Sequence, residues 1–450
     1  ALLDDWVAST SHWLKNTVGV SQHVTVGMEG FYDSASENQA AGGTPSWFAS
    51  QGTDFISNHD HAAIDIAGFH MYQQPWGMTT DGAQKWIADH IRRGRLELDR
   101  PVLFNEVGYL YDRSGDPATD DERIAHYKMY FKTAYRNKVS GVNFWTLYHD
   151  AYPDYDNYGV YYPADAETAD TIARFSGKMR LFNHTGIHQL TAFEYDLDGF
   201  ERVTHGGVSA IERVEDSGWA PAGDGAARVA FELGAGEKFM VGAPMIDDLS
   251  GEAGFDVSTF GYKNLVACIM VEDNATFEPG DLYVKLYDFS GGGTYAAGGG
   301  QDILEAGEWI ELAWDSGAAG DLSTLEEIGI DVWANDHYDG AIRVEFIGGD
   351  VTDLRDNTAT GYLPLGDFTA DGALNGLDIP EFKQALADAS AWRDITGRDP
   401  HYYGDFNGDG VMNGLDIPGF KTALAGATIP EPMTAILVTA ALAAAMRRRA

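Results

Sequence analysis

An alternation of short apolar strands with helical stretches over the first 180 or so residues constrains the fold most strongly. The predicted strands are 23–27, 65–72, 101–109 and 141–149. Strands that alternate with helices predict a parallel sheet. The strands recur about every 40 residues, a little more than the roughly 31 residues per unit of a 250-residue (β/α)8 barrel, so barrel units with insertions fit this spacing.

Polar and aromatic side chains stand where these strands end. They are Glu29, His70, Tyr72, Glu106 and Trp145. In a (β/α)8 barrel the C-terminal strand ends carry the chemistry. A carboxylate that follows an apolar strand is costly to bury unless it is paired, so Glu106 is either a salt-bridged structural group or a catalytic one. Its neighbours at equivalent heights favour catalysis, and ordinary packing at the barrel mouth is the alternative.

Five segments together carry a family resemblance. They are HVTVGMEGF at 23–31, GTDFI at 52–56, IDIAGFHMY at 64–72, PVLFNEVG at 101–108 and FW at 144–145. In this order they resemble the second half of the barrel of endo-β-1,4-mannanases of glycoside hydrolase family five. The resemblance covers about the first 180 residues and implies a retaining hydrolase that acts on β-mannan or a related polysaccharide.

The resemblance also implies a role for each strand-end residue. Glu106 would be the nucleophile that forms a glycosyl-enzyme intermediate, oriented by His70 and Tyr72. Trp145 would stack under the sugar ring, since an indole offers a broad, rigid apolar surface. Glu29 resembles the fifth-strand acid that lines a substrate subsite, and Trp76 is a similar substrate-binding candidate.

One expected element of the family is missing. Retaining hydrolysis needs a second carboxyl about 5 to 5.5 Å from the nucleophile. The family places this acid/base in an Asn-Glu-Pro motif at the end of the fourth strand, and no such motif precedes the fifth-strand match at 23–31. Residues 1–15 instead resemble the helix just before the fifth strand. We therefore expect an upstream segment, and a chain that is inactive alone.

The alternation changes to short strands with glycine-rich turns from about residue 190. Predicted strands are 227–233, 265–272, 282–289, 309–314, 328–333 and 342–347. Such spacing without helices predicts a β-sandwich. Alternation places Asp331 and Trp333 on the outer face, and likewise Arg343 and Glu345. An exposed Trp333 beside charges would make a sugar platform, so the region resembles a jelly-roll carbohydrate-binding module. A purely structural sandwich is the alternative.

An internal repeat follows, in which GDFTADGALNGLDIP at 366–380 matches GDFNGDGVMNGLDIP at 404–418. Both copies place oxygen ligands at positions 1, 3, 5, 9 and 12 of a calcium loop, with glycine at position 6 and the position 7 carbonyl. The first loop offers Asp367, Thr369, Asp371, Ala373, Asn375 and Asp378, and the second offers Asp405, Asn407, Asp409, Val411, Asn413 and Asp416. A solvated acidic turn is the alternative to bound Ca²⁺.

Aspartate at position 12, followed by Ile-Pro and a predicted helix, resembles a type I dockerin. That resemblance implies a cohesin partner, although the repeat could also serve only as a spacer. The chain ends in Pro430-Glu431-Pro432, an apolar stretch at 433–446 and three arginines. This end resembles a PEP-CTERM sorting signal. It implies membrane-associated sorting, and a secreted or cell-surface location in a Gram-negative bacterium.

Charge and cysteine content bound the remaining function classes. Asp and Glu number 69 against 30 Lys and Arg, so a net charge of −39 argues against nucleic acid as a partner and suits neutral polysaccharide or calcium. Solubility alone is the alternative, and by itself the acidity favours it. The single cysteine, Cys268, lies in an apolar strand and is predicted to be in the core.

The predicted organisation is therefore multidomain. It comprises the second half of a (β/α)8 barrel (1–188), a β-sandwich (189–351), a linker (352–361), a small α-helical dockerin-like calcium-binding repeat pair (362–428) and a sorting signal with an apolar helix (429–450). Two other functions stay open. One is another family-five β-glycanase, such as an endoglucanase, and the other is a non-catalytic carbohydrate-binding surface protein.

Overall fold

A computed structural model describes most of the chain. The described residues are 2–43, 47–111, 117–149, 152–193, 196–215, 225–274, 276–351, 366, 368, 374, 376, 378–389, 392, 400, 404, 406 and 412–426. The chain divides into two compact units, Ala1–Thr352 and Asp353–Ala450. The predicted linker at 352–361 and the predicted sorting signal at 429–450 lie outside the described residues.

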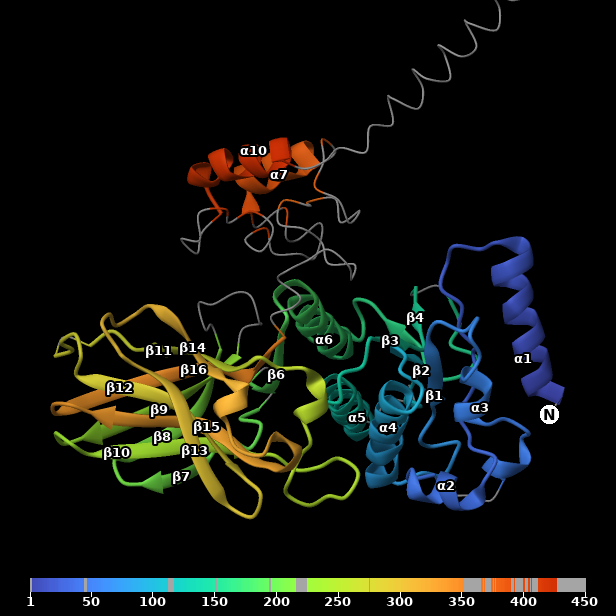
Figure 1. The fold of residues 1–450 in the computed structure, drawn as a ribbon, viewed down its shortest axis with the longest axis horizontal. Coiled ribbons are helices and arrows are strands. Elements are labelled where there is room, and N and C mark those ends of the chain that lie inside the picture. Colours follow the sequence, from blue (N-terminus) through green and yellow to red (C-terminus); the bar gives the residue numbers. More distant parts are fainter. Residues whose placement is uncertain are drawn as a thin grey trace, which may run out of the picture. The chain divides into compact units, whose positions relative to one another are not determined.

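The first unit begins with parallel strand–helix repeats (Figure 1). Strands β1 (Ala67–Met71), β2 (Val102–Val107) and β3 (Gly141–Phe144) form a parallel sheet in that order. A parallel bridge from Thr25 to Ile66 is what the described structure shows of the predicted strand at 23–27. The predicted parallel βα units are confirmed, and they resemble part of a barrel.

Among the described residues, six α-helices belong to the same part of the chain as this sheet, and a short parallel strand pair follows it. The helices are α1 (Leu2–Trp13), α2 (Ala35–Ala40), α3 (Phe55–His59), α4 (Thr80–Leu96), α5 (Pro117–Arg136) and α6 (Ala166–Thr185), and the strand pair is β4 (Leu147–Tyr148) with β5 (Val160–Tyr161). The Thr79 hydroxyl caps α4 by accepting from the Gly82 backbone N–H at 3.0 Å. Trp86 of α4 is fully buried, and the rings of Phe69 and Phe104 stack at 4.5 Å on adjacent strands. This apolar core fixes the strand ends.

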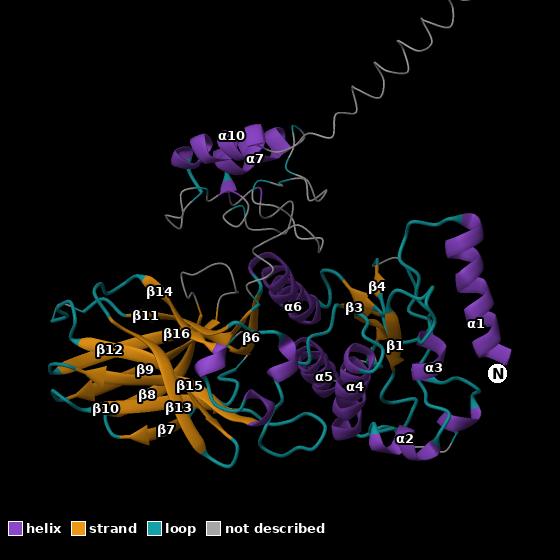
Figure 2. Cartoon of the chain, viewed as in Figure 1, coloured by secondary structure: helices purple, strands orange, loops and turns teal. Residues whose placement is uncertain are grey.

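Two antiparallel sheets make up the rest of the first unit (Figure 2). One has the order β13-β12-β15-β10-β7, and the other has the order β14-β11-β16-β9-β8, with β6 also paired to β16. Their bounds are β6 Ile187–Ala192, β7 Arg202–His205, β8 Val208–Glu215, β9 Gly225–Leu233, β10 Lys238–Pro244, β11 Asn264–Val271, β12 Leu282–Ser290, β13 Thr294–Asp302, β14 Trp309–Asp315, β15 Leu325–Ala334 and β16 Tyr338–Asp350. The predicted sandwich is confirmed.

The prediction that Glu345 points outward into solvent is wrong. It is 1% exposed. Glu345 is skipped in the pairing of β16 with β11, between Phe346 opposite Cys268 and Val344 opposite Ile269, so the simple alternation of faces breaks at this residue. Cys268 is buried as predicted. Burial, and then the nearby carboxylates of Glu345 and Glu311, raise the pKa of its thiol well above the ordinary value.

The sandwich docks on α4 and α5 through a loop that follows β10. Arg92 of α4 forms an ion pair with Asp247 at 2.6 Å, and the Asn137 amide donates to Asp248 at 2.8 Å. The Arg136 guanidinium lies over the ring of Phe255, 4.3 Å from its centroid. These polar and cation–π contacts explain why the parallel sheet and the sandwich form one compact unit.

The second unit has a small aromatic core. Helices α7 (Asp378–Ala387) and α10 (Ile417–Gly426) each follow one copy of the repeat. Phe382 and Phe420, one from each helix, stack at 3.9 Å. No helix among the described residues has both the length and the apolar character that crossing a bilayer requires. The apolar stretch at 433–446 lies outside that part of the chain, so the sorting signal stays a prediction.

Candidate active site

Glu106 and His70 lie opposite each other at the C-terminal ends of β2 and β1. The parallel register pairs these two residues directly after an irregularity between Phe69 and His70. Because parallel strands end at one edge of the sheet, side chains from separate strands meet there. The sheet brings together Glu29, His70, Tyr72 and Glu106, all of which were candidates from the sequence.

The Glu106 carboxylate is held from one side. The Tyr72 hydroxyl donates a hydrogen bond to Glu106 Oε2 at 2.7 Å, and His70 Nδ1 lies 3.6 Å from the same oxygen. Burial, followed by the hydrogen bond to Glu106, raises the pKa of Tyr72 far above its ordinary value. Tyr72 therefore stays protonated and acts as a neutral donor. The Glu106 side chain is 35% exposed, which leaves it accessible to a ligand.

Glu29 lies on the other side of the same imidazole. Its Oε2 is 3.5 Å from His70 Nδ1, and this buried oxygen has no hydrogen-bond partner among the described residues. The His70 side chain, 12% exposed, thus stands between two carboxylates. One ring nitrogen of His70 therefore lies within 3.6 Å of a carboxylate oxygen of both Glu29 and Glu106.

Trp145 continues the backbone pairing with β2 just after the end of β3. Its backbone N–H donates to the Val107 carbonyl at 2.8 Å, which places the indole beside the end of β2. The indole Nε1–H donates to Asp156 Oδ2 at 2.9 Å. The peptide bond between Trp145 and Thr146 is cis. The half-buried ring keeps part of its surface accessible, as a sugar platform requires.

Trp76 has a different environment from Trp145. It is 8% exposed and packs edge-to-face against Phe31, Phe48 and Trp86. A tryptophan this deeply buried presents little ring surface to a sugar. Its substrate-binding role stays a prediction, and what the structure displays is a core side chain that adjoins Tyr72.

Trp333 lies on the outer face of the five-stranded sheet and is half-buried. Lys238 Nζ lies 4.5 Å from its ring centroid, and Lys285 Nζ lies 5.6 Å from it. Both lysines also face the fully buried Asp331, which accepts a hydrogen bond from the Tyr295 hydroxyl at 2.9 Å. These lysines were not among the charges expected from the sequence and they cover part of the ring, while the expected Asp331 is buried.

Most of the predicted calcium ligands lie outside the described residues. Asp378, Asn413 and Asp416 are described, and the Asp416 carboxylate accepts from the backbone N–H groups of Phe406 and Asn413 at 2.8 and 2.7 Å. Among the residues that the structure describes, no group of three or more His, Cys, Asp or Glu could hold a metal ion. The calcium prediction therefore stays a prediction.

Two contacts of the site were missed from the sequence. Asp156 accepts the hydrogen bond from Trp145, and the ring of Tyr158 meets that of Tyr72 edge-on at 5.1 Å. A signal was available in the run DYDNYG at 154–159, where aspartates and tyrosines alternate before a glycine. Aspartates at such spacing favour turns that cap their own backbone.

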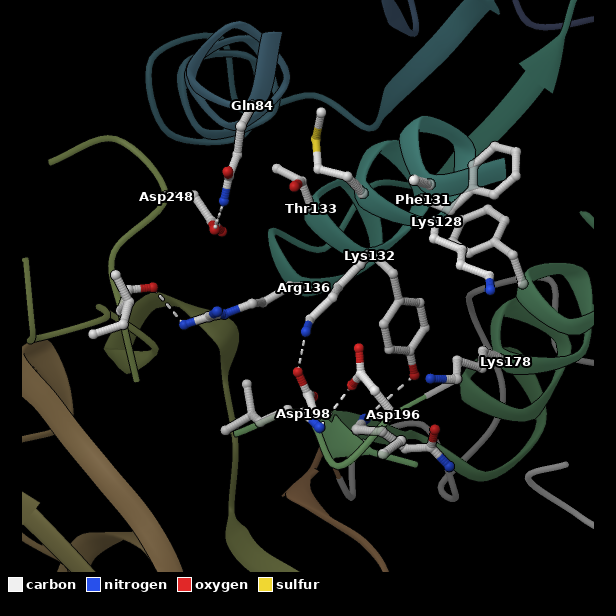
Figure 3. Close-up of a pocket in the computed structure, with 18 residues that line it drawn as sticks. Gln84, Lys128, Phe131, Lys132, Thr133, Arg136, Lys178, Asp196, Asp198 and Asp248 are labelled. Atoms are coloured by element: carbon white, nitrogen blue, oxygen red, sulfur yellow. Dashed lines mark hydrogen bonds and ion pairs between the residues drawn. The ribbon is translucent and has the colours of Figure 1, made fainter. Parts of the chain in front are cut away.

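A cavity of about 480 Å³ lies between α5, α6 and β6, away from these strand ends (Figure 3). In its wall Lys132 forms an ion pair with Asp198, and the Gln84 amide donates to Asp248 at 2.8 Å. None of the predicted site residues lines this cavity. Its polar pairs belong to the junction between the helices and the sandwich, so the candidate active site is defined by the strand ends.

The fold and site together define a class: parallel βα units resembling part of a barrel, with a carboxylate among aromatic residues at the strand ends, followed by an antiparallel sandwich. Comparisons with known proteins sharpen this description. No protein-family model matches the chain. Over part of its length, however, the chain is related to mannan endo-1,4-β-mannosidases.

Two plant proteins illustrate the relationship. The chain is 30% identical over 169 residues to mannan endo-1,4-β-mannosidase 5 of Arabidopsis thaliana, covering 35% of this chain and 39% of that protein. It is also 30% identical over 193 residues to mannan endo-1,4-β-mannosidase 3 of Solanum lycopersicum, covering 41% and 47%. The chain thus spans less than half the length of these two relatives.

Solved structures give weaker likenesses. The hyperthermostable endo-1,4-β-D-mannanase of Thermotoga petrophila RKU-1 is 25% identical with a TM-score of 0.34, covering 39% of this chain and 51% of that chain. The module CBM27-1 of Caldicellulosiruptor saccharolyticus, solved in complex with mannohexaose, is 15% identical with a TM-score of 0.26, covering 35% and 90%.

Proposed function

We propose that the first unit carries the nucleophile-bearing part of a retaining endo-β-1,4-mannanase that acts in polysaccharide catabolism. The observation that supports this most is the Tyr72–Glu106 hydrogen bond of 2.7 Å at a strand end, beside His70 and Trp145. Tyr72 holds Oε2 and thereby presents the other carboxylate oxygen for attack on an anomeric carbon. The relatives' names supply the substrate class, β-mannan.

In this mechanism the Glu106 oxygen forms a bond to the anomeric carbon while the bond to the leaving group breaks. The positive charge that develops on the sugar is balanced by the carboxylate. The proposal assigns no acid/base to this chain, because none of the segments that carry the resemblance includes the family's Asn-Glu-Pro motif. The 450-residue chain should therefore fail to hydrolyse soluble mannan, and measurable hydrolysis would contradict that part of the proposal.

The nucleophile can be tested without an acid/base residue. In 2-deoxy-2-fluoro-β-mannosyl fluoride the leaving group is fluoride, which departs with its bonding electrons and needs little protonation. We expect the chain to gain one 2-deoxy-2-fluoromannosyl group, by intact mass, with peptide mapping to Glu106. The matched control Glu106→Gln should gain none. Faster labelling by the glucosyl analogue would favour an endoglucanase, and no labelling by either reagent would overturn the proposal.

A second candidate function is non-catalytic carbohydrate binding by the sandwich. The observation that favours it is the aromatic pair Trp333 and Tyr295, which shares one sheet face with Lys238 and Lys285 around Asp331. Such a face can stack a pyranose and hydrogen-bond its hydroxyls. Retention of the chain on mannan after Glu106→Gln, with no labelling of the unsubstituted chain, would favour this function alone.

We further propose that the second unit binds Ca²⁺ through its two acidic loops, and that the chain is exported to the cell surface. The buried Asp416 and the helix after each repeat support the calcium proposal. A cohesin partner belongs to the same proposal. If chelation leaves the far-UV circular dichroism of residues 362–428 unchanged, the calcium proposal fails.

A further inference from the structure

The segment 152–159 contacts two residues of the candidate site at once. Asp156 accepts the indole N–H of Trp145 at 2.9 Å, while the ring of Tyr158 meets that of Tyr72 at 5.1 Å and an angle of 68°. Trp145 is the proposed sugar platform, and Tyr72 holds the proposed nucleophile Glu106. This one loop therefore contacts both the residue proposed to bind the sugar and the residue that holds the proposed nucleophile.

The contact to Trp145 is suited to fixing a ring. An indole has a single polar donor, so a carboxylate at that donor sets the rotation of the ring about its side-chain bonds. Asp156 is itself oriented, because its other oxygen accepts from the Tyr158 backbone N–H at 3.2 Å. A platform that is already oriented loses less freedom when a sugar binds.

The contact to Tyr72 depends on a glycine. A Cβ at Gly108 would lie 2.7 Å from Tyr158 Cδ1, so the absence of a side chain at the end of β2 admits the Tyr158 ring. Tyr158 then supports the Tyr72 ring, whose hydroxyl donates to Glu106. Burial, and then the charge of Asp156, raise the pKa of Tyr158 to about 12, so its hydroxyl stays neutral.

Hydrogen bonds to protein groups hold the shape of this loop. Asp154 accepts from the backbone N–H groups of Asn157 at 2.8 Å and Gly159 at 3.2 Å. The Tyr111 N–H donates to the Asn157 carbonyl at 2.9 Å, and the buried Arg123 of α5 donates to the Gly159 carbonyl at 3.3 Å. The loop is thus anchored to α5 and to the segment that follows β2.

We infer that Asp156 and Tyr158 are positioning residues of the proposed glycosylation step, with Asp156 orienting Trp145 for sugar binding and Tyr158 supporting Tyr72 against Glu106. This inference rests on the proposed function. The two residues should affect different kinetic quantities. A sugar platform binds the ground state and the transition state alike, so loss of Asp156 should weaken reagent binding. Tyr158 supports the group that holds the nucleophile, so its loss should slow the attack.

The test is saturation kinetics of Glu106 labelling in the full 450-residue chain with 2-deoxy-2-fluoro-β-mannosyl fluoride, followed by intact mass. Asp156→Ala should raise the half-saturating reagent concentration about tenfold with little change in the limiting rate. Tyr158→Ala should instead lower the limiting rate about tenfold. The conservative variant Tyr158→Phe, which keeps the ring, should stay close to the unsubstituted chain. Asp156→Asn keeps only one of the two acceptor oxygens that Asp156 uses, so its half-saturating concentration should lie between those of the unsubstituted chain and Asp156→Ala.

The outcomes separate the inference from the proposed function. If the unsubstituted chain labels at Glu106 but neither alanine variant departs from it, the positioning roles are overturned while the nucleophile stands. A lower limiting rate in Asp156→Ala with an unchanged half-saturating concentration would also overturn the role of Asp156, because its hydrogen bond would then not act on sugar binding. Absence of any label in the unsubstituted chain overturns both. Thermal unfolding of each variant shows whether a loss of labelling reflects loss of the fold. If an alanine variant is unfolded, labelling of Asp156→Asn or Tyr158→Phe tests the same role in a folded chain.

Discussion

Glu106 in the parallel sheet and Asp331 in the sandwich each accept a hydrogen bond from a tyrosine, at 2.7 and 2.9 Å, yet their surroundings differ. Asp331 is fully buried, and Lys285 and Lys238 lie 3.4 and 3.5 Å from it. Glu106 is 35% exposed and has a neutral tyrosine donor. A carboxylate neutralised by two cations is suited to holding a sheet face together, whereas one with a neutral donor and an open side can react.

The variant Asp331→Ala tests the structural role of the buried carboxylate. Removing the buried carboxylate leaves two lysines facing each other without their counter-charge, so the free energy of unfolding should fall by about 3 kcal/mol. Urea unfolding measures this loss. Labelling of Glu106 by the fluoromannosyl reagent should continue at its former rate, since Asp331 is not part of that site. The control Glu106→Gln should lose labelling while its free energy of unfolding stays close to that of the unsubstituted chain. A loss below about 1 kcal/mol in Asp331→Ala would contradict a structural role for Asp331.

The histidines also include buried and exposed members, and a buried one makes the stability of the fold depend on pH. His188 is fully buried between the Tyr135 carbonyl and the Tyr262 hydroxyl, and burial lowers its pKa from 6.5 to about 3. The folded state therefore favours the neutral ring. The stability that depends on this neutral form is complete above pH 6.5 and is lost as the pH falls toward 3.

When the pH falls from 6.5 to 5, His188 alone should lower the free energy of unfolding by about 2 kcal/mol. Urea unfolding at the two pH values measures the loss. In His188→Gln the loss should shrink by that amount, while the exposed His23 provides a control in His23→Gln. The assignment fails if His188→Gln keeps the acid sensitivity of the unsubstituted chain. His59, whose pKa burial lowers to about 4, should supply part of what remains.

The smallest expected effect concerns Trp333. Its ring is partly covered by lysines, so Trp333→Ala should weaken retention on soluble mannan in affinity electrophoresis by roughly threefold to tenfold, the range of one aromatic contact. Trp13, which is 53% exposed on α1, provides the matched control Trp13→Ala. Unchanged retention in Trp333→Ala would make the sandwich face purely structural.

The strand ends of the first unit could be predicted because their signal is local. Apolar runs located β1, β2 and β3, and parallel strands that end together bring His70 opposite Glu106. Asp156 could not be assigned in the same way. It is 11 positions from Trp145 in sequence, and their contact depends on how the intervening loop folds.

Burial was harder to predict than strand position. Trp76 follows a proline in a loop, and its burial depends on Phe31 and Phe48 from a distant segment. Strand β13 was missed because its glycines weaken a strand signal. Packing explains why one of these glycines is present, since a Cβ at Gly298 would lie 2.3 Å from Trp314 Nε1. Tertiary contact decides such positions, and periodicity does not report it.

The buried Cys268 has a practical consequence. Because it is the only cysteine in the sequence and its thiol is buried with a raised pKa, the folded chain offers thiol-directed reagents almost nothing to attack. A cysteine introduced at the exposed Tyr155 would then be the single reactive handle on the protein. A spin label or fluorophore placed there would report on the loop beside Trp145 without any background from the native sequence.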